Sequence, residues 1–426
     1  MNDTTYRTLV LAVALAGTGC DGTEPGETGS GGTPGSGGVA ATGGTTSTGG
    51  TVTATGGKAT GGTTTATGGT STGGTATGGK ASGGTASGGK ATGGTATGGA
   101  GSITGPCDIY ASASTPCVAA YSTVRRLSST YSGPLYQVRK GGSSLGSGGT
   151  TADIGALADG FADGAAQDTA CGTSGACTVS ILYDQSGRGN NLKVAPAGCY
   201  SGTASEPDYE SNAKGRSLNA SGHKVYALYT IAHDGYRNNA PSGVPTEIQP
   251  QGVYMVADGK RYGTACCFDF GNAGKDNCYG TTGIMDALFF GTGYWGKGAG
   301  SGPWFMADFE AGVWAGGSGA SNAVNSNLPS STMDYAFGIL KTTSTSSAST
   351  YAIRVGNAQS GGLTTAYDGA APKVLRKSGA IILGIGGDNS NSSYGTFFEG
   401  AMTAGRPSDA TDAAVLANVQ AARYGQ

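Results

Sequence analysis

The segment Pro303-Trp304-Phe305-Met306-Ala307-Asp308-Phe309-Glu310 is predicted to form a β-strand. Successive side chains of a strand point to opposite faces, so Asp308 and Glu310 are expected on one face and Ala307 and Phe309 on the other. Similar short apolar runs, separated by Gly, Asn, Ser and Asp, are Val179–Tyr183, Val225–Ile231, Val253–Ala257, Ala287–Phe290, Trp304–Trp314, Tyr335–Leu340, Tyr351–Val355, Ala380–Ile385 and Gly395–Met402. Many short strands with long connections predict an all-β, two-sheet β-sandwich.

A few short helices are expected beside these strands. Thr115 followed by Pro116 is typical of a helix start, and periodic apolar residues continue to Leu127. A second helix is predicted from about Asp412–Tyr424, ending before Gly425. Together with the strands, these helices define a folded part that covers residues 105–426.

Two segments of different character precede the folded part. Residues 1–20 resemble an export signal, because the apolar run Leu9–Ala16 is too short to span a bilayer. Cleavage after Ala16 would give a secreted protein, and cleavage before Cys20 would give a bacterial lipoprotein acylated at that cysteine. Residues 21–104 repeat short Gly/Thr/Ala/Ser units without large side chains, so we expect a disordered tether there.

The number and pairing of the cysteines bear on export. The chain has nine, an odd number, and removing Cys20 leaves eight in the folded part, which favours lipidation over the alternative of a free thiol. Pairing by proximity would join Cys107 to Cys117 and Cys171 to Cys177. If Cys266 bonds Cys267, then Cys199 and Cys278 remain for each other. The protein is therefore expected to be exported, as a cell-surface lipoprotein or in secreted form.

The composition limits the classes of molecule that the protein is expected to bind. The chain carries 25 Lys and Arg against 27 Asp and Glu, a formal net charge of −2, which suggests neither nucleic acid nor an anionic membrane surface. Membrane contact is expected only through a lipid at Cys20. His223 and His233 lie in no zinc-binding pattern, and the chain has no nucleophile elbow and no phosphate-binding loop. We therefore predict no metal and no organic cofactor.

Carboxylates remain as the candidate catalytic groups. Asp308 and Glu310 share a strand face with Trp304, and Trp295 lies just upstream, a combination that suits a sugar-cleaving cleft. The alternative is a solvated face whose acids have no function. Asp388 follows the run Ala380–Ile385 in a Gly-rich loop, where it could reach a ligand or form an Asx turn or a weak calcium loop.

Cys266 and Cys267 are adjacent in the chain. Consecutive Cα atoms lie about 3.8 Å apart, closer than ordinary disulfides prefer, so a bond between these two would be strained. Strain of this kind usually marks a functional surface. The alternatives are that each pairs elsewhere or that both bind a metal.

Several segments taken together resemble the catalytic domain of the α-L-arabinofuranosidase B family, family 54 of the glycoside hydrolases. The resemblance covers essentially all of residues 105–426. The segments are Gly105–Tyr110, Thr115–Ala120, Ala166–Thr169, Tyr183–Gly187, Gly235–Asn239, Ala265–Asn272, Gly302–Trp304 and Gly379–Asn391. The adjacent cysteines and the loop Gly386-Gly387-Asp388-Asn389-Ser390-Asn391 are its most specific parts.

The resemblance implies a concanavalin-like (jelly-roll type) sandwich and an exo-acting, retaining enzyme. Such an enzyme would release terminal L-arabinofuranosyl groups from arabinose-containing plant polysaccharides, such as arabinan and arabinoxylan, without a cofactor. It implies Glu310 as nucleophile and Asp388 as general acid/base, and such a pair needs carboxyls about 5–5.5 Å apart. The implied sugar contacts are Asp308, Trp295, the backbone at Gly387 and the disulfide Cys266–Cys267.

Two departures from the family pattern are visible. Ala311-Gly312-Val313 follow Glu310 where relatives carry Asn-Asn-Leu, and Cys199 and Cys278 are additions. Two further hypotheses remain at this point: a surface-tethered arabinan-binding lectin on the same fold, and an endo-acting glycanase. A lectin would not need both Glu310 and Asp388, so their joint presence favours the enzyme.

Overall fold

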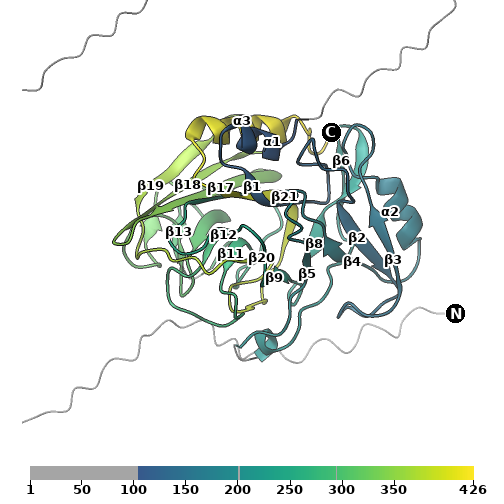
Figure 1. Cartoon of the computed structure of the whole chain (residues 1–426), viewed down its shortest axis with the longest axis horizontal. Helices are drawn as coiled ribbons and strands as arrows, with labels where there is room; N and C mark the ends of the chain where they lie inside the picture. The colour runs from purple at the N-terminus through teal and green to yellow at the C-terminus, as the bar shows by residue number, and fades with distance from the viewer. Residues whose placement is uncertain (1–103, 200–201, 294) are drawn as a thin grey trace, which may run out of the picture. The chain divides into compact units, whose positions relative to one another are not determined.

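A computed structural model of the chain describes residues 104–199, 202–293 and 295–426 (Figure 1). These residues form two large antiparallel sheets and three α-helices, so the predicted all-β, two-sheet architecture is confirmed. The predicted export signal with Cys20 lies outside the described residues, as does the predicted tether 21–104 except for Thr104. No helix of the described part is long and apolar enough to cross a membrane.

The first sheet has seven strands. In spatial order they are β1 (Cys117–Ser122), β21 (Gly395–Ala404), β10 (Gln251–Asp258), β17 (Tyr335–Ser344), β18 (Ser349–Asn357) and β19 (Thr364–Ala370), with β8 (Leu228–Thr230) also paired to β21. All eight residues of β10 are buried, because this central strand has a partner on each side and apolar layers above and below.

The second sheet has ten strands. In spatial order they are β15 (Val313–Trp314), β14 (Trp304–Asp308), β12 (Asp286–Gly291), β11 (Asp269–Ala273), β20 (Ala380–Leu383), β9 (Tyr236–Asn238), β5 (Leu192–Val194), β4 (Cys177–Leu182), β2 (Tyr136–Lys140) and β3 (Thr150–Ile154). Neighbouring strands β14, β12, β11 and β20 therefore bring together the chain segments around residues 269, 308 and 383.

Smaller elements surround the two sheets. They are the two-stranded pairs β13 (Lys297–Gly298) with β16 (Val324–Asn325) and β6 (Ser217–Ala220) with β7 (His223–Tyr226), the helices α1 (Pro106–Ser112), α2 (Gly164–Cys171) and α3 (Asp409–Gln420), and the 3-10 helix η1 (Gly202–Ser205).

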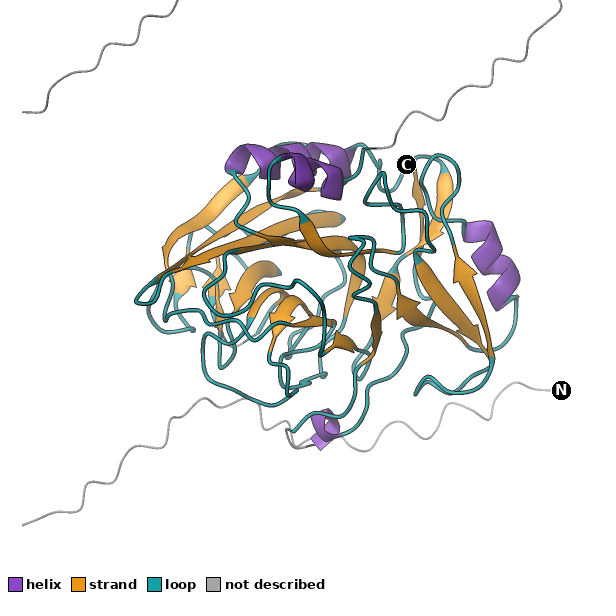
Figure 2. Ribbon diagram, viewed as in Figure 1, coloured by secondary structure: helices purple, strands orange, loops and turns teal. Residues whose placement is uncertain are grey.

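The two sheets are stacked (Figure 2). Strands β10, β17 and β18 of one sheet contact β11, β12 and β14 of the other. Aromatic rings fill the space between them. Phe270 of β11 lies with its ring centroid 6.0 Å from Tyr121 of β1 and 5.5 Å from Phe397 of β21. Phe305 of β14 packs directly on Gly338 of β17, where a Cβ would lie 2.4 Å from the ring. Because an aromatic ring of one sheet packs on a glycine of the other, the two sheets can approach closely. Close packing of this kind makes the interface between the sheets rigid.

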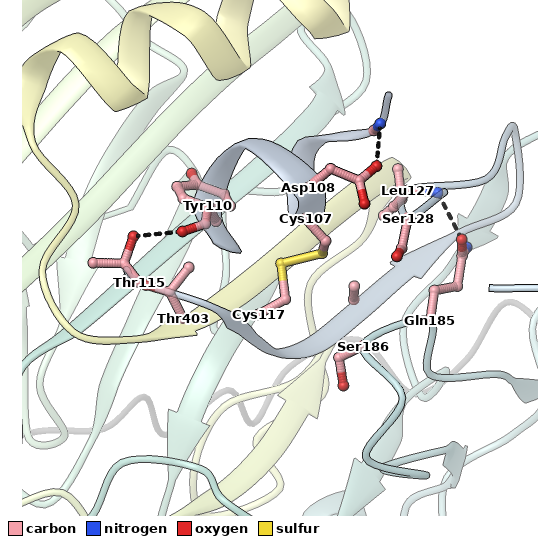
Figure 3. The surroundings of a disulfide bond; sticks show 12 residues. Cys107, Asp108, Tyr110, Thr115, Cys117, Leu127, Ser128, Gln185, Ser186 and Thr403 are labelled. Atoms are coloured by element: carbon pink, nitrogen blue, oxygen red, sulfur yellow. Dashed lines mark hydrogen bonds between the residues drawn. A yellow bond between two sulfur atoms is a disulfide. The ribbon is translucent and has the colours of Figure 1, made fainter. Parts of the chain in front are cut away.

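The helix predicted from Thr115 is wrong. Cys117–Ser122 is strand β1, with all six residues buried, and the helix α1 lies upstream at Pro106–Ser112. A short apolar run that is buried on both faces carries no periodicity, so a buried strand looks like part of a helix. Figure 3 shows that Cys107 of α1 and Cys117 of β1 are joined by a disulfide.

The other predicted elements are found close to their expected positions. The C-terminal helix is confirmed, although it starts at Asp409, where the Ser408 side chain accepts a hydrogen bond from Thr411 N–H (3.1 Å). Each of the nine apolar runs overlaps at least one strand. Trp304–Trp314 contains two strands, β14 and β15, separated by a turn that carries Glu310.

Candidate active site

A cleft of about 350 Å³ opens beside the end of β14, the loop after β20 and the residues before β11. Its lining consists of Cys266, Cys267, Tyr279, Met285, Trp295, Asp308, Glu310, Ala311, Gly312, Val313, Ala320, Ser321, Asn322, Gly386, Gly387, Asp388 and Ser390. All seven residues predicted to act on or contact a sugar therefore line one cleft, and three segments distant in sequence supply most of them.

The turn after β14 places two carboxyls in the cleft. Asp308 is the last residue of the strand, and its Oδ1 accepts a hydrogen bond from Glu310 N–H (2.8 Å). Glu310 and Ala311 have φ of 69° and 52°, so the chain leaves the extended conformation there. The prediction that Glu310 lies on a strand is therefore wrong: the Asx-type hydrogen bond ends the alternation two residues early. Both carboxyls are buried, and both face the cleft.

The adjacent cysteines form the predicted vicinal disulfide just before β11. Because the two sulfur atoms are bonded to each other, they are not thiolate ligands for a metal. Sγ of Cys267 lies 3.8 Å from Oδ2 of Asp308, and Sγ of Cys266 lies 3.1 Å from Oγ of Ser390. The disulfide thus forms a wall between the turn that carries Asp308 and the loop that carries Asp388.

The loop after β20 supplies the third carboxyl. Oδ1 of Asp388 accepts a hydrogen bond from Ser390 N–H (2.9 Å), so the Asx turn foreseen as an alternative is present in a residue that also lines the cleft. From β9, the buried Arg237 donates to the carbonyl oxygen of Gly387 (3.0 Å). Arg237 therefore fixes the loop from behind.

Gly387 brings this loop against Glu310. A Cβ at residue 387 would lie 2.3 Å from Oε2 of Glu310 and 3.0 Å from Sδ of Met285. No real side chain tolerates the first distance unless the carboxyl moves. Glycine at 387 thus permits the backbone next to Asp388 to touch the carboxyl of Glu310.

Burial and neighbouring carboxyls raise the proton affinity of two acids in the cleft, Glu310 and Asp308. Burial raises the pKa of Glu310 to about 8, with Asp308 and Asp388 adding to the effect, whereas Gly280 N–H (3.2 Å from Oε1) and Arg237 oppose it. Burial also raises the pKa of Asp308 to about 7, with a smaller contribution from Asp388. Burial therefore favours the protonated forms of Glu310 and Asp308 near neutral pH, as expected for carboxyls in a desolvated space.

Asp269, the first residue of β11, is a fourth acid that sequence reasoning missed. It is fully buried next to the carboxyl of Asp308. Neither Asp269 oxygen receives a hydrogen bond from a donor among the described residues. Burial and the charge of Asp308 raise the pKa of Asp269 well above its ordinary value. Asp269 is therefore protonated, and its O–H can donate a hydrogen bond to Asp308. Period-two alternation, which places residue 269 on the face of Cys267, could have revealed it.

Other residues near the cleft also gave no clear signal in the sequence. Tyr279 and Met285 lie in a loop and beside a strand end, where no pattern predicts which way a side chain points. Trp304, predicted to share the acidic face, does not line the cleft; Trp295 does, with its ring edge-on to Phe289 (5.9 Å). His223 and His233 are not part of the lining.

The structure contains three further disulfides. They join Cys107 to Cys117, Cys171 to Cys177 and Cys199 to Cys278. The first two tie helices α1 and α2 to strands β1 and β4. The third lies next to Tyr279 in sequence, at the border of the cleft.

Comparison with known proteins agrees with this arrangement. Residues 106–425 match the family described as "Alpha-L-arabinofuranosidase B, catalytic". The chain is 49% identical over 331 residues to a probable α-L-arabinofuranosidase B of Aspergillus fumigatus, covering 76% of this chain and 63% of that protein. It is 48% identical over 335 residues to an arabinofuranosidase/B-xylosidase of Trichoderma koningii, covering 76% of this chain and 64% of the relative.

Solved structures give the same picture. A glutamate-to-glutamine mutant of a GH54 α-L-arabinofuranosidase soaked with 4-nitrophenyl α-L-arabinofuranoside superposes with a TM-score of 0.70 at 43% identity, covering 75% of this chain and 66% of that one. An arabinofuranosidase complexed with arabinofuranosyl-α-1,2-xylobiose gives the same TM-score, identity and coverage.

The fold and cleft are thus those of a glycoside hydrolase β-sandwich. Within that class, the chain belongs to the family of α-L-arabinofuranosidase B catalytic domains, glycoside hydrolase family 54. It spans 63–64% of the length of the two curated relatives described here.

Replacing Glu310 should stabilise the protein at neutral and alkaline pH. The carboxyl ionises near pH 4.5 when unfolded but near 8 when folded, so folding takes up a proton between these values and the free energy of unfolding of wild type falls as pH rises. Glu310→Gln removes this cost and keeps an acceptor for Gly280 N–H. We expect the variant to gain roughly 4 kcal/mol over wild type at pH 8 and almost nothing at pH 4.5, measured by urea unfolding. The exposed Glu247→Gln serves as control, and a Glu310→Gln gain independent of pH would contradict the prediction.

The neutral state of Asp269 can be tested separately. Asparagine resembles a protonated carboxyl in shape and can donate to Asp308, so Asp269→Asn should change the free energy of unfolding at pH 7 by less than about 1 kcal/mol. Asp269→Ala leaves Asp308 without this donor and opens a cavity, so a loss of about 2–3 kcal/mol is expected in the same urea titration. Equal losses in both variants would show that Asp269 is not a neutral donor.

Proposed function

We propose that this protein is a retaining, exo-acting α-L-arabinofuranosidase that releases terminal L-arabinofuranosyl groups from arabinoxylan- or arabinan-type polysaccharides. The observation that carries the proposal is the contact between the Gly387–Asp388 loop and Glu310, which puts carboxyls from two distant segments into one cleft. Retaining glycosidases need two such groups at short range. Family membership supports the sugar, and a family structure bound to arabinofuranosyl-α-1,2-xylobiose supports arabinoxylan as a substrate class.

In the first step, a carboxylate oxygen of Glu310 forms a bond to the anomeric carbon while the bond to the leaving oxygen breaks. Asp388 gives its proton to that oxygen. In the second step, Asp388 takes a proton from water, the water oxygen bonds to the anomeric carbon, and the bond to Glu310 breaks. Two displacements at one carbon retain the configuration, and no cofactor takes part.

The remaining lining residues would hold the furanose. The Cys266–Cys267 disulfide offers a rigid, polarisable wall to one face of the ring without loss of side-chain entropy. Asp308 and the backbone at Gly387 supply polar groups for sugar hydroxyls, and Trp295 closes one side. Because Asp269 keeps its proton, it adds no further negative charge next to Asp308.

The pKa shifts in the cleft bear on which acid is the nucleophile. Burial raises the pKa of Glu310, which by itself would suit the acid, whereas the proposed nucleophile must be ionised. Gly280 N–H and Arg237 favour the ionised form of Glu310, as does the positive charge that develops on the sugar in the transition state. We therefore assign Glu310 as nucleophile and Asp388 as acid/base, and treat the reversed roles as the competing assignment.

Hydrolysis of 4-nitrophenyl α-L-arabinofuranoside by the full chain tests the activity, and azide rescue tests the roles. We expect both Glu310→Gly and Asp388→Ala to lose at least about three orders of magnitude in kcat. With azide and α-L-arabinofuranosyl fluoride, the Glu310 variant should give the inverted β-azide, because azide takes the nucleophile's place. The Asp388 variant, given azide and the nitrophenyl substrate, should give the retained α-azide.

Two results would contradict this proposal. Exchanged azide products would reverse the roles of the two acids. A folded wild type that binds arabinan but hydrolyses neither substrate would instead favour the arabinan-binding lectin.

Gly387→Ala should disable the site without unfolding the protein. The added Cβ would displace the end of the Glu310 side chain, which can move, so the free energy of unfolding should change by less than about 2 kcal/mol. We expect kcat on the nitrophenyl substrate to fall at least a hundredfold, since small misplacements of reacting groups cost about that much. Gly155→Ala, where a Cβ meets nothing within 4 Å, is the matched control. A Gly387→Ala variant with wild-type kcat would show that the contact is not required.

Export is part of the proposal. Four disulfides in the described part of the chain are typical of an oxidising compartment. The lipid anchor at Cys20 and the tether 21–104 stay predictions from the sequence.

A further inference from the structure

One aromatic ring at the cleft has no part in the proposed chemistry. Tyr279 lines the cleft with 46% of its surface exposed. Five other large hydrophobic residues of the described chain are comparably exposed, and none of them lines the cleft: Leu145, Tyr209, Ile231, Val324 and Tyr394. Tyr279 is therefore an exposed aromatic surface at the mouth, where a bound sugar would emerge from the site.

The backbone that carries this ring is held tightly to a neighbouring segment. The disulfide Cys199–Cys278 lies immediately before Tyr279. The buried Asn277 donates from Nδ2 to the carbonyl oxygens of Pro196 (2.8 Å) and Ala197 (2.9 Å), and its own carbonyl accepts from Cys199 N–H (3.1 Å). One disulfide and three hydrogen bonds thus join residues 196–199 to residues 277–278.

Residues adjacent to this link contact the carboxyl of Glu310 and the backbone of Asp388. Gly280, next to Tyr279, donates its N–H to Oε1 of Glu310 (3.2 Å). Gly198, next to Cys199, packs so closely behind Asp388 that a Cβ there would lie 2.5 Å from the carbonyl oxygen of residue 388. The position of Tyr279 is therefore fixed relative to both acids, and not merely to the nearby loop.

We propose that Tyr279, held by the Cys199–Cys278 disulfide, forms the binding subsite for the leaving group, a pyranose ring of the polysaccharide main chain. This inference rests on the proposed arabinofuranosidase function. An exo-acting enzyme encloses the terminal furanose, so the rest of the substrate must lie at the mouth of the cleft. Pyranose rings present apolar C–H faces, and an aromatic ring with two rotatable side-chain bonds binds such a face at low entropic cost.

Two substrates that differ in the leaving group separate this role from catalysis. Arabinofuranosyl-α-1,2-xylobiose has a pyranose leaving group, whereas α-L-arabinofuranosyl fluoride has a leaving group too small to reach the ring. For Tyr279→Ala in the full chain, we expect kcat/KM on the xylobioside to fall about tenfold while kcat/KM on the fluoride stays within about twofold of wild type. The fluoride rate also reports that the variant is folded and that Glu310 is in place.

Control variants sharpen the test. Tyr279→Phe keeps the ring and should retain the wild-type ratio between the two substrates, and Tyr209→Ala removes an exposed ring away from the cleft and should leave both rates unchanged. Equal losses on both substrates in Tyr279→Ala, or no loss on either, would overturn the subsite. A wild type inactive on both substrates would overturn the proposed function itself, a result distinct from either of these.

Discussion

The backbone of Gly387 lies against the carboxyl of Glu310, and the rest of the cleft is arranged around this contact. The two segments involved are almost eighty residues apart in sequence, and they meet because β14, β12, β11 and β20 are neighbours in one sheet. β14 and β20 run in opposite directions in that sheet, and the turn after β14 and the loop after β20 meet in the cleft. Strand order, which a single sequence does not reveal, is therefore what turns two isolated acids into a pair.

Bringing ionised acids together in a desolvated space raises the free energy of the folded state. Only a few positive charges in the described structure compensate for this. Arg237 is the buried cation beside Glu310 and Asp388, and it also binds the Gly387 carbonyl. Beneath the cleft, Asp269 removes one charge by keeping its proton instead of by pairing with a cation. The cleft is thus built to hold protons as well as anions, a property that an enzyme using one carboxyl in each state requires.

Much of the fold and of the cleft could be predicted from the sequence, but for different reasons. The short alternating runs predicted the sheets, and the sequence motifs predicted which residues would gather at the cleft. The sequence does not distinguish Cys117–Ser122 from a helix, because burial on both faces removes the periodicity that separates a strand from a helix. The sequence predicts Glu310 on a strand, because the local hydrogen bond to Asp308 that ends the extended chain leaves the apolar pattern unchanged. Asp269 and Tyr279 depend on packing between distant segments, which no local pattern encodes.

The vicinal disulfide also makes the formation of the cleft depend on the redox environment. The wall that it forms between Asp308 and Ser390 exists only after two thiols have been oxidised. In the reducing cytoplasm, a newly made chain would carry two separate sulfhydryls in place of that wall. Completion of the cleft is therefore coupled to an oxidising environment.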